Sequence, residues 1–571
     1  MGENMKLKDQ KMKNVIKSLA NNIRAERIDH GSFLSIYSGY ENISNIKNIM
    51  NSVIYGRRGS GKTHLLKALS EVVIDEFEQK RVFPIYLDLR RIIPLLSSDG
   101  LADVDAILIF KYIMGEISYS LYENLGFILG TNEFDDSGAL VNDIHGKLVS
   151  DYFSKIYLEM DGRTLKKATD LKVSEEEVRS LNAEVDISKD PRVAFKKGNN
   201  QKKITETSHR SHISVLDITN AFENLLKELD LNGVMLLIDE WSELGSDIQP
   251  SLAEILKKTF SAINVYLKIA AIPNRTELGY KSEKKFIGLE DGGDIFGYHL
   301  DLRYVFEVNK SQTRDFFNDL LYRHLSSIDK DTIDSFISNE RTTSANFINL
   351  LFANVALNEI LVACAGIPRD FINLFLNSYD RFLLSSTASA KRINVKSVRA
   401  ANSEWYEKDK KEQVDKNNTE RVLLTEIVKE VVHKKKSMHF LIPEEYSNNK
   451  HIQNLIDFRV IHLRKNGYSH KDHAGVSYNV YSVDYGCYNS LNIAKSKLES
   501  LMDGDLNVKD LREIRRISLE KEFFDKFLIN IGEAFFCPNP KCKQAIDVNH
   551  PVYIKQGICN NCWEKIALPE G

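Results

Sequence analysis

The sequence predicts an α/β fold with a parallel sheet, followed along the chain by an all-α domain, a winged-helix-like domain and a small cysteine-rich module. Three observations support this prediction. Short apolar runs alternate with helical segments between about residues 52 and 306, the strongly periodic segments between 311 and 407 are helical, and four of the six cysteines lie near the end of the chain. A chain of 571 residues is too long for one hydrophobic core, so several domains are expected.

Composition narrows the class of protein. The residues are 43% apolar and 27% charged, which is typical of a soluble globular protein. No apolar run approaches the ~18 residues of a membrane span, and residues 1–30 do not read as a secretory signal, so we expect a cytoplasmic protein without membrane contact. The formal net charge is −3, so any contact with nucleic acid must come from a local basic patch.

The chain order suggests five regions. They are a charged, partly helical extension at 1–30, an α/β domain at 31–308 with an insertion at about 131–210, a helical lid at 309–407, a winged-helix-like domain at 417–500, and a helical connector with a zinc ribbon at 501–571. A lysine-rich stretch at 408–416 is expected to be a linker.

Residues 56–63 read Gly-Arg-Arg-Gly-Ser-Gly-Lys-Thr, a complete G-x-x-x-x-G-K-[ST] match. An apolar run at 52–55 precedes it as a strand, and a helical pattern at 64–69 follows, so the match has the strand-loop-helix context of a P-loop. The alternative is a chance glycine-rich turn. In a P-loop the lysine reaches the β and γ phosphates of a nucleotide, and the Thr hydroxyl ligates Mg²⁺. The predicted nucleotide-binding residues are Gly56, Arg57, Arg58, Gly59, Ser60, Gly61, Lys62, Thr63 and His64.

Further buried strands follow the P-loop helix. They are expected at 82–89, 234–238, 266–272 and 302–306, with helices up to about Leu129 and again at 215–229. The alternation of strands and helices predicts that the sheet is parallel.

Two carboxylates, Asp239 and Glu240, end the strand at 234–238. Asp239 can hold Mg²⁺, and Glu240 is placed to polarise a water for attack on the γ phosphate, so the pair predicts hydrolysis rather than binding alone. Glu243 could share this role. The alternative is that the two residues cap the helix that follows.

Two more polar positions could complete the site. Asn274 follows the next strand and is a candidate for orienting the attacking water, with Arg275 as the less favoured choice and an ordinary turn as the alternative. Arg369 stands in Gly-Ile-Pro-Arg at a helix start, where a cation could reach the phosphates. Its alternative is an ion pair with Asp370 or another surface carboxylate.

Together, the P-loop, the Asp-Glu strand, the polar strand end and the Gly-x-Pro-Arg helix resemble the AAA+ ATPases of the ORC/Cdc6 type over roughly residues 33–405. The stretch from Gly366 to Phe375 looks like bacterial members of this group. The resemblance implies an α/β domain with a helical lid, ATP bound between domains or subunits, Asn274 as sensor 1 and Arg369 as sensor 2. The insertion at 131–210 departs from the usual compact core.

The resemblance also implies a homo-oligomer in which a neighbouring subunit supplies an arginine to the site. Arg303 is the candidate, and an ion pair with Asp301 or Glu307 is the alternative. The expected function is an ATP-hydrolysing molecular switch that couples nucleotide state to oligomerisation and to DNA or a partner protein, in phage defence or mobile-element biology. Two alternatives are a replication initiator and a non-catalytic, ATP-locked scaffold that recruits an effector protein.

Helices at 420–432 and 449–458 followed by strands at 459–465 and 478–483 suggest a winged helix. It could bind DNA or protein. The candidate DNA contacts are Asn448, Asn449, Lys450, His451, Gln453, Arg464, Lys465, His470, Lys471 and His473, with Lys434–Lys436 adding charge.

The last four cysteines form two pairs, Cys537-x4-Cys542 and Cys559-x2-Cys562, separated by sixteen residues. This spacing predicts two knuckles with four thiolates around Zn²⁺, and four ligands leave no open position, so the site should be structural. An iron–sulfur cluster is the alternative. Cys364 and Cys487 are expected to be buried thiols, and His550 a loop residue.

Overall fold

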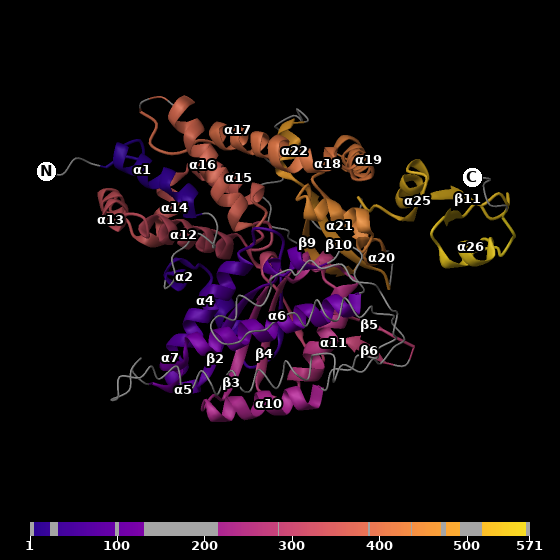
Figure 1. The fold of residues 1–571 in the computed structure, drawn as a ribbon. Coiled ribbons are helices and arrows are strands. Elements are labelled where there is room, and N and C mark those ends of the chain that lie inside the picture. Colours follow the sequence, from indigo (N-terminus) through magenta and orange to yellow (C-terminus); the bar gives the residue numbers. More distant parts are fainter. Residues whose placement is uncertain are drawn as a thin grey trace, which may run out of the picture. The chain divides into compact units, whose positions relative to one another are not determined.

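The computed structural model describes residues 5–22, 32–96, 102–130, 215–283, 285–385, 387, 389–435, 437–469, 475–490 and 517–566 (Figure 1). The insertion predicted at 131–210 lies outside these residues. The chain divides into two compact units. One comprises Ile28–Gly56 and Gly61–Leu300, and the other comprises Met1–Arg27, Arg57–Ser60 and Asp301–Gly571.

The first unit is built on a five-stranded sheet in the order β2-β3-β4-β1-β7, and the pairings between its neighbouring strands are all parallel. Its strands are β1 (Ser52–Tyr55), β2 (Val82–Asp88), β3 (Gly233–Asp239), β4 (Val265–Ala271) and β7 (Phe296–His299). All seven residues of β3 are buried, as a strand covered on both faces requires. The predicted parallel sheet is confirmed.

Helices cover both faces of this sheet. Successive side chains of a strand point to opposite faces, and in β3 buried apolar side chains lie on both faces. Leu236 and Ile238 of β3 pack in one cluster with α6, α10 and α11, whereas Met235 and Leu237 pack in another with α2, α3 and α4. The helices of this unit are α2 (Phe33–Ile36), α3 (Tyr40–Ile46), α4 (Lys62–Asp75), α5 (Phe77–Lys80), α6 (Ala102–Glu123), α7 (Leu125–Leu129), α10 (Val215–Glu228) and α11 (Ile248–Phe260). A hairpin of β5 (Gly279–Lys281) and β6 (Phe286–Gly288) lies beside α11.

The strand predicted at 302–306 is wrong. A 3₁₀ turn, Asp301–Tyr304, occupies these positions, and the fifth strand is β7, a few residues earlier. β7 lies at the edge of the sheet, and three of its four residues are exposed, so its sequence carries no apolar run. The apolar residues Tyr304 and Phe306 are buried in the core of the second unit instead, and Val305 is buried as well.

The second unit begins with a helical domain. Its helices are α12 (Lys310–Ser326), α13 (Lys330–Asn339), α14 (Phe347–Leu351), α15 (Asn354–Ala363), α16 (Pro368–Ser385) and α17 (Val395–Trp405). The N-terminal helix α1 (Gln10–Ser18) belongs to the same core through Met12, Val15 and Ile16. The Tyr379 hydroxyl donates to the Leu7 carbonyl at 2.7 Å, which ties the extension to α16.

The linker predicted at 408–416 is also wrong, because the chain there is helical. α17 continues through a widened π-helical turn, Tyr406–Lys411, into α18 (Glu412–Asp415). Its lysines pair with glutamates four residues earlier, as Lys411 does with Glu407 and Lys416 with Glu412, and such pairs stabilise a helix. Lys410 is fully buried, so this segment is part of the core.

The C-terminal domain of this unit contains an antiparallel sheet in the order β8-β10-β9. The strands are β8 (His439–Pro443), β9 (Ile461–Ser469) and β10 (Ser477–Val483), and the helices are α19 (Asn418–Ile427), a π-helical continuation Val428–Lys434, α20 (Glu444–Ser447), α21 (Lys450–Asp457) and α22 (Tyr485–Ser490). The predicted strand pair is confirmed, and β8 was missed. The winged-helix assignment stays a prediction.

The end of the described chain forms a small module with α25 (Lys521–Asn530), β11 (Ala534–Phe536), β12 (Ala545–Asp547) and α26 (Pro551–Gln556). Five of its buried residues form a separate small core, and two of these are cysteines. Among the described residues, no helix is both long and apolar enough to cross a membrane.

Candidate functional site

The P-loop joins the end of β1 to the start of α4, where Gly61 is the N-cap. Gly59 and Gly61 have φ angles of 85° and 94°, in the left-handed region that glycine adopts without steric cost. The Gly56 N–H donates to the Ala271 carbonyl at 3.1 Å, which anchors the loop to β4. The Lys62 ammonium lies over the loop and donates to the Gly56 carbonyl at 2.7 Å. A helix N-terminus preceded by such a loop is a site for phosphate groups.

Asp239 ends β3 and is 1% exposed. The Tyr86 hydroxyl donates to its Oδ2 at 2.8 Å, the Glu240 N–H donates to its Oδ1 at 2.9 Å, and the Thr63 side chain hydrogen-bonds to it as well. Burial raises the pKa of Asp239, while the bonds from Thr63 and Tyr86 and the charge of Lys62 oppose that rise. The structure therefore brings together the two residues predicted to hold Mg²⁺, Thr63 and Asp239, and oxygen ligands of this kind suit that ion.

Glu240 follows directly in a left-handed conformation with a φ angle of 60°, which is uncommon for a residue with a side chain. Its side chain makes no capping bond to the 3₁₀ turn Trp241–Glu243, so Glu240 does not act as a side-chain cap of that turn. Burial first, and then the charge of Asp239, raises the pKa of Glu240. A carboxylate with a raised pKa beside a phosphate-binding loop can accept a proton from water.

Arg90 is a residue that the sequence reasoning missed. Its Nη1 lies 3.5 Å from Glu240 Oε1, and its Nη2 lies 2.7 Å from Asp88 Oδ2. Asp88 is paired in register with Asp239 across β2 and β3, so both strands place charged groups at the same edge of the sheet. The proximity of Arg90 to Glu240 follows from the pairing of β2 with β3, and the sequence of β2 does not show which strand lies beside it.

Asn274 lies in the 3₁₀ turn Pro273–Arg275 that follows β4, and it is exposed. β4 pairs with β3 on one side and with β1 on the other, so the turn follows the strand between Asp239 and the P-loop. The Ser242 hydroxyl accepts from the Ile272 N–H at 2.6 Å, which ties this turn to the segment after Glu240. The strand order agrees with the expectation for Asn274, and its role stays a prediction.

Arg369 starts α16 in the second unit, which also contains residues 57–60 of the P-loop. Its backbone N–H donates to the Gly59 carbonyl at 3.2 Å, and a Cβ added to Gly59 would lie 2.7 Å from the Arg369 Cβ. Asp370 is fully buried and hydrogen-bonded by Arg459. The carboxylate suggested as an alternative partner of Arg369 is therefore bound to another arginine.

Arg303 lies in the 3₁₀ turn Asp301–Tyr304 and is partly buried. Glu307, one of its suggested partners, forms an ion pair with Arg464 at 3.1 Å. The role of Arg303 in a neighbouring subunit's site stays a prediction.

Comparison with known proteins supplies the family. The model of the ORC-CDC6-like family matches residues 18–485 of the chain. The chain belongs to the ORC-CDC6-like family. It is thus an ORC/Cdc6-like AAA+ protein, a kind that generally binds and hydrolyses ATP. No curated protein matches its sequence.

Three solved chains from ORC structures align with most of this chain at low sequence identity and low TM-score. A chain in the structure of Drosophila ORC bound to DNA has a TM-score of 0.29 at 10% identity, with 88% of this chain and 95% of that one covered. The Aeropyrum pernix ORC1 protein in complex with DNA has a TM-score of 0.25 at 11% identity, covering 87% and 97%. The Aeropyrum pernix ORC2 protein, in ADPNP–ADP complexes, has a TM-score of 0.30 at 10% identity, covering 88% and 97%.

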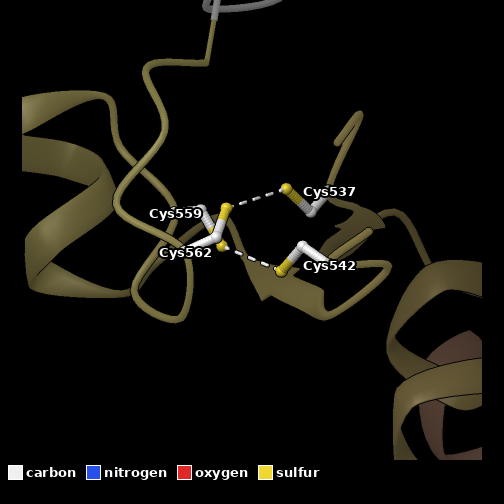
Figure 2. A group of neighbouring side chains, drawn as sticks. All are labelled: Cys537, Cys542, Cys559 and Cys562. Atoms are coloured by element: carbon white, nitrogen blue, oxygen red, sulfur yellow. Dashed lines mark hydrogen bonds between the residues drawn. The ribbon is translucent and has the colours of Figure 1, made fainter. Parts of the chain in front are cut away.

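The ORC-CDC6-like match ends before the cysteine module, where all four predicted ligands come together (Figure 2). Their sulfur atoms lie within 4.8 Å of one another, with Cys537 to Cys562 at 3.7 Å and Cys542 to Cys559 at 3.8 Å. Tetrahedral Zn²⁺ with Zn–S bonds of ~2.3 Å places its sulfurs about 3.8 Å apart. The four thiols are free, so the donor set and its spacing fit Zn²⁺.

Two predicted DNA contacts of this ORC-CDC6-like chain are wrong, because the side chains are internal. Arg464 is 2% exposed and pairs with Glu307, and His451 is 5% exposed and lies 3.0 Å from Glu420. Asn449 instead caps α21. Lys450 and Lys465 are exposed. Residues 470, 471 and 473 lie outside the described residues.

Proposed function

We propose that this ORC-CDC6-like protein is an ATP-hydrolysing switch that couples nucleotide state to self-association and to the engagement of DNA. One observation carries the proposal: Asp239 at the end of β3 is hydrogen-bonded to Thr63 of the P-loop, with Glu240 next in the chain. A protein that only binds nucleotide needs the loop, whereas a buried carboxylate beside the P-loop threonine is the arrangement that P-loop hydrolases use.

Each residue has a defined task in this proposal. Lys62 binds the β and γ phosphates, and Thr63 and Asp239 hold Mg²⁺, which would offset the charge of the phosphates. Glu240 orients and deprotonates the attacking water, and Arg90 at 3.5 Å keeps that carboxylate in place.

Three further residues act on the γ phosphate or on the water in this proposal. Asn274 orients the water from the turn after β4. Arg369, whose backbone is bonded to Gly59, contacts the phosphates, and Arg303 of a neighbouring subunit completes the site. An arginine supplied in this way would make hydrolysis depend on the oligomer.

Phosphate release by the purified full-length protein tests the catalytic part. Glu240→Gln keeps the size of the side chain and removes the base, so we expect ATP to bind with near wild-type affinity and turnover to fall by 10²-fold or more. Lys62→Ala should lose ATP binding itself. Equal phosphate release by wild type and Glu240→Gln, with and without DNA, would favour the scaffold alternative in which ATP only locks an assembly and an effector protein is recruited.

The family match favours a second candidate setting, a DNA replication initiator, beside phage defence or mobile-element biology. An initiator should bind duplex DNA with a sequence preference, and its affinity should fall steeply with salt because bound counterions are released. Anisotropy titrations with specific and scrambled duplexes at several salt concentrations test this. Protection of cells against phage, lost in Glu240→Gln, is the result expected for a defence role.

A further inference from the structure

A buried chain of polar side chains begins at the P-loop itself, at Arg57. This residue occupies a position that the motif leaves open to any amino acid, yet its side chain is only 6% exposed. Its Nη1 lies 2.8 Å from Nδ1 of His462 on β9, and its Nη2 donates to the Ala365 carbonyl at 2.8 Å. All three residues belong to one compact unit of the chain.

His462 connects Arg57 to a carboxylate. It is 1% exposed, and its Nε2 lies 2.7 Å from Oδ2 of Asp484, which directly follows β10. A guanidinium can only donate, so Nδ1 of His462 accepts the bond from Arg57 and the ring proton lies on Nε2, facing Asp484. Burial lowers the pKa of His462 well below its usual value, so the ring is neutral and can hold both bonds at once.

The chain of contacts then returns to the start of α16. Asp484 is fully buried and accepts from Lys410 at 2.7 Å, and the Lys410 ammonium lies 3.7 Å from Oδ2 of Asp370. Asp370 also accepts from Arg459 and is the residue after Arg369. Buried charges are costly unless they are paired, so each member fixes the position of the next.

We propose that Arg57 is a positioning residue for the nucleotide site, through which His462 on β9 sets the conformation of the P-loop. The inference rests on the proposed function, because it concerns the affinity of that site for ATP. A ligand of the C-terminal domain that displaced β9 would break the bond between Arg57 and His462 and so loosen residues 57–60. Events at the C-terminal domain are thereby read out as a change in nucleotide affinity.

A double-mutant cycle on the full-length protein tests the coupling, with the dissociation constant of a fluorescent ATP analogue in Mg²⁺ as the readout. Arg57→Ala and His462→Ala should each weaken binding roughly tenfold, since each removes a hydrogen bond to a charged group. The double variant should be no weaker than the single ones, because either change breaks the same link.

Arg58→Ala is the matched control. Arg58 is the next residue, is exposed and carries the same charge, so this variant removes a like charge from the same loop. Whatever its own effect, it should combine multiplicatively with His462→Ala, because Arg58 has no part in the Arg57–His462 contact.

His462→Gln is the conservative variant that separates positioning from a loss of folding. Its amide oxygen can accept from Arg57 and its amide nitrogen can donate to Asp484, so it should restore the affinity to within about threefold of wild type. Multiplicative effects of Arg57→Ala and His462→Ala, or an unchanged ATP affinity in a folded Arg57→Ala protein, would overturn the inference. Failure of the wild type to bind the analogue would overturn the proposed function and this inference with it.

Discussion

The packing of the P-loop against the start of α16 can be tested at a single atom. A Cβ built on Gly59 would lie 2.7 Å from the Arg369 Cβ, which is closer than two non-bonded carbon atoms can approach. In addition, the φ angle of 85° at Gly59 is strained for any residue with a side chain. Gly59→Ala should therefore combine a backbone cost of about 1–2 kcal/mol with an overpacking cost of about 1–3 kcal/mol. We expect the unfolding free energy to fall by about 2–5 kcal/mol.

Gly61 supplies the control. Its φ angle is 94°, and a Cβ there would meet nothing within 4 Å, so Gly61→Ala should lose only the backbone part, about 1–2 kcal/mol. The midpoint of thermal unfolding, measured without nucleotide, should be lower in Gly59→Ala than in Gly61→Ala by several degrees.

A second change identifies the atom responsible. Arg369→Gly removes the Cβ and should restore part of the stability lost in Gly59→Ala, whereas Arg369→Ala keeps that atom and should restore less. Equal midpoints for Gly59→Ala and Gly61→Ala would refute the close approach of Gly59 and Arg369.

Three other predictions concern the metal module, acid stability and the catalytic edge. One equivalent of Zn²⁺ per chain should be released when the thiols of the cysteine module are chemically modified. Cys559→Ser should lower the zinc content measured by mass spectrometry. It should also expose residues 534–566 to proteolysis, because metal binding stabilises so small a module. Burial lowers the pKa of His439 to about 3, so below pH ~6.5 the unfolded chain binds a proton at this residue that the folded chain does not. His439 alone should therefore contribute a fall in stability of up to about 1.4 kcal/mol per pH unit between pH 6.5 and 5, and a pH series of urea unfolding should show a smaller fall in His439→Gln. Arg90→Ala should lower turnover by about tenfold with little change in the affinity for ATP, and a matching loss of affinity would contradict its proposed action on Glu240.

Local patterns were enough to predict the parts of the site that depend on one strand or one loop. The P-loop follows the buried strand β1, and Asp239 and Glu240 stand at the end of the buried strand β3. The neighbouring residues in the sequence are therefore enough to place them. The cysteine pairs are likewise a local pattern. Each of these predictions needed only the period of a strand or the spacing of ligands.

The features that were missed depend on partners distant in the chain. Arg90 meets Glu240 because β2 and β3 are neighbours, and Arg57 meets His462 across about four hundred residues. From the sequence, Arg464 and His451 were expected to be exposed. Both side chains are buried instead, Arg464 against Glu307 and His451 against Glu420. A charge is predicted to be solvated by default, and only tertiary structure shows when it is paired.

Native mass spectrometry of the full-length protein tests the central claim, that ATP hydrolysis controls assembly. With Mg²⁺ and ATP, Glu240→Gln should accumulate a larger assembly, because it binds ATP and does not turn it over. The wild type should form the same assembly transiently and return to the smaller species with ADP. The same mass for both proteins in ATP, in ADP and without nucleotide would contradict the account.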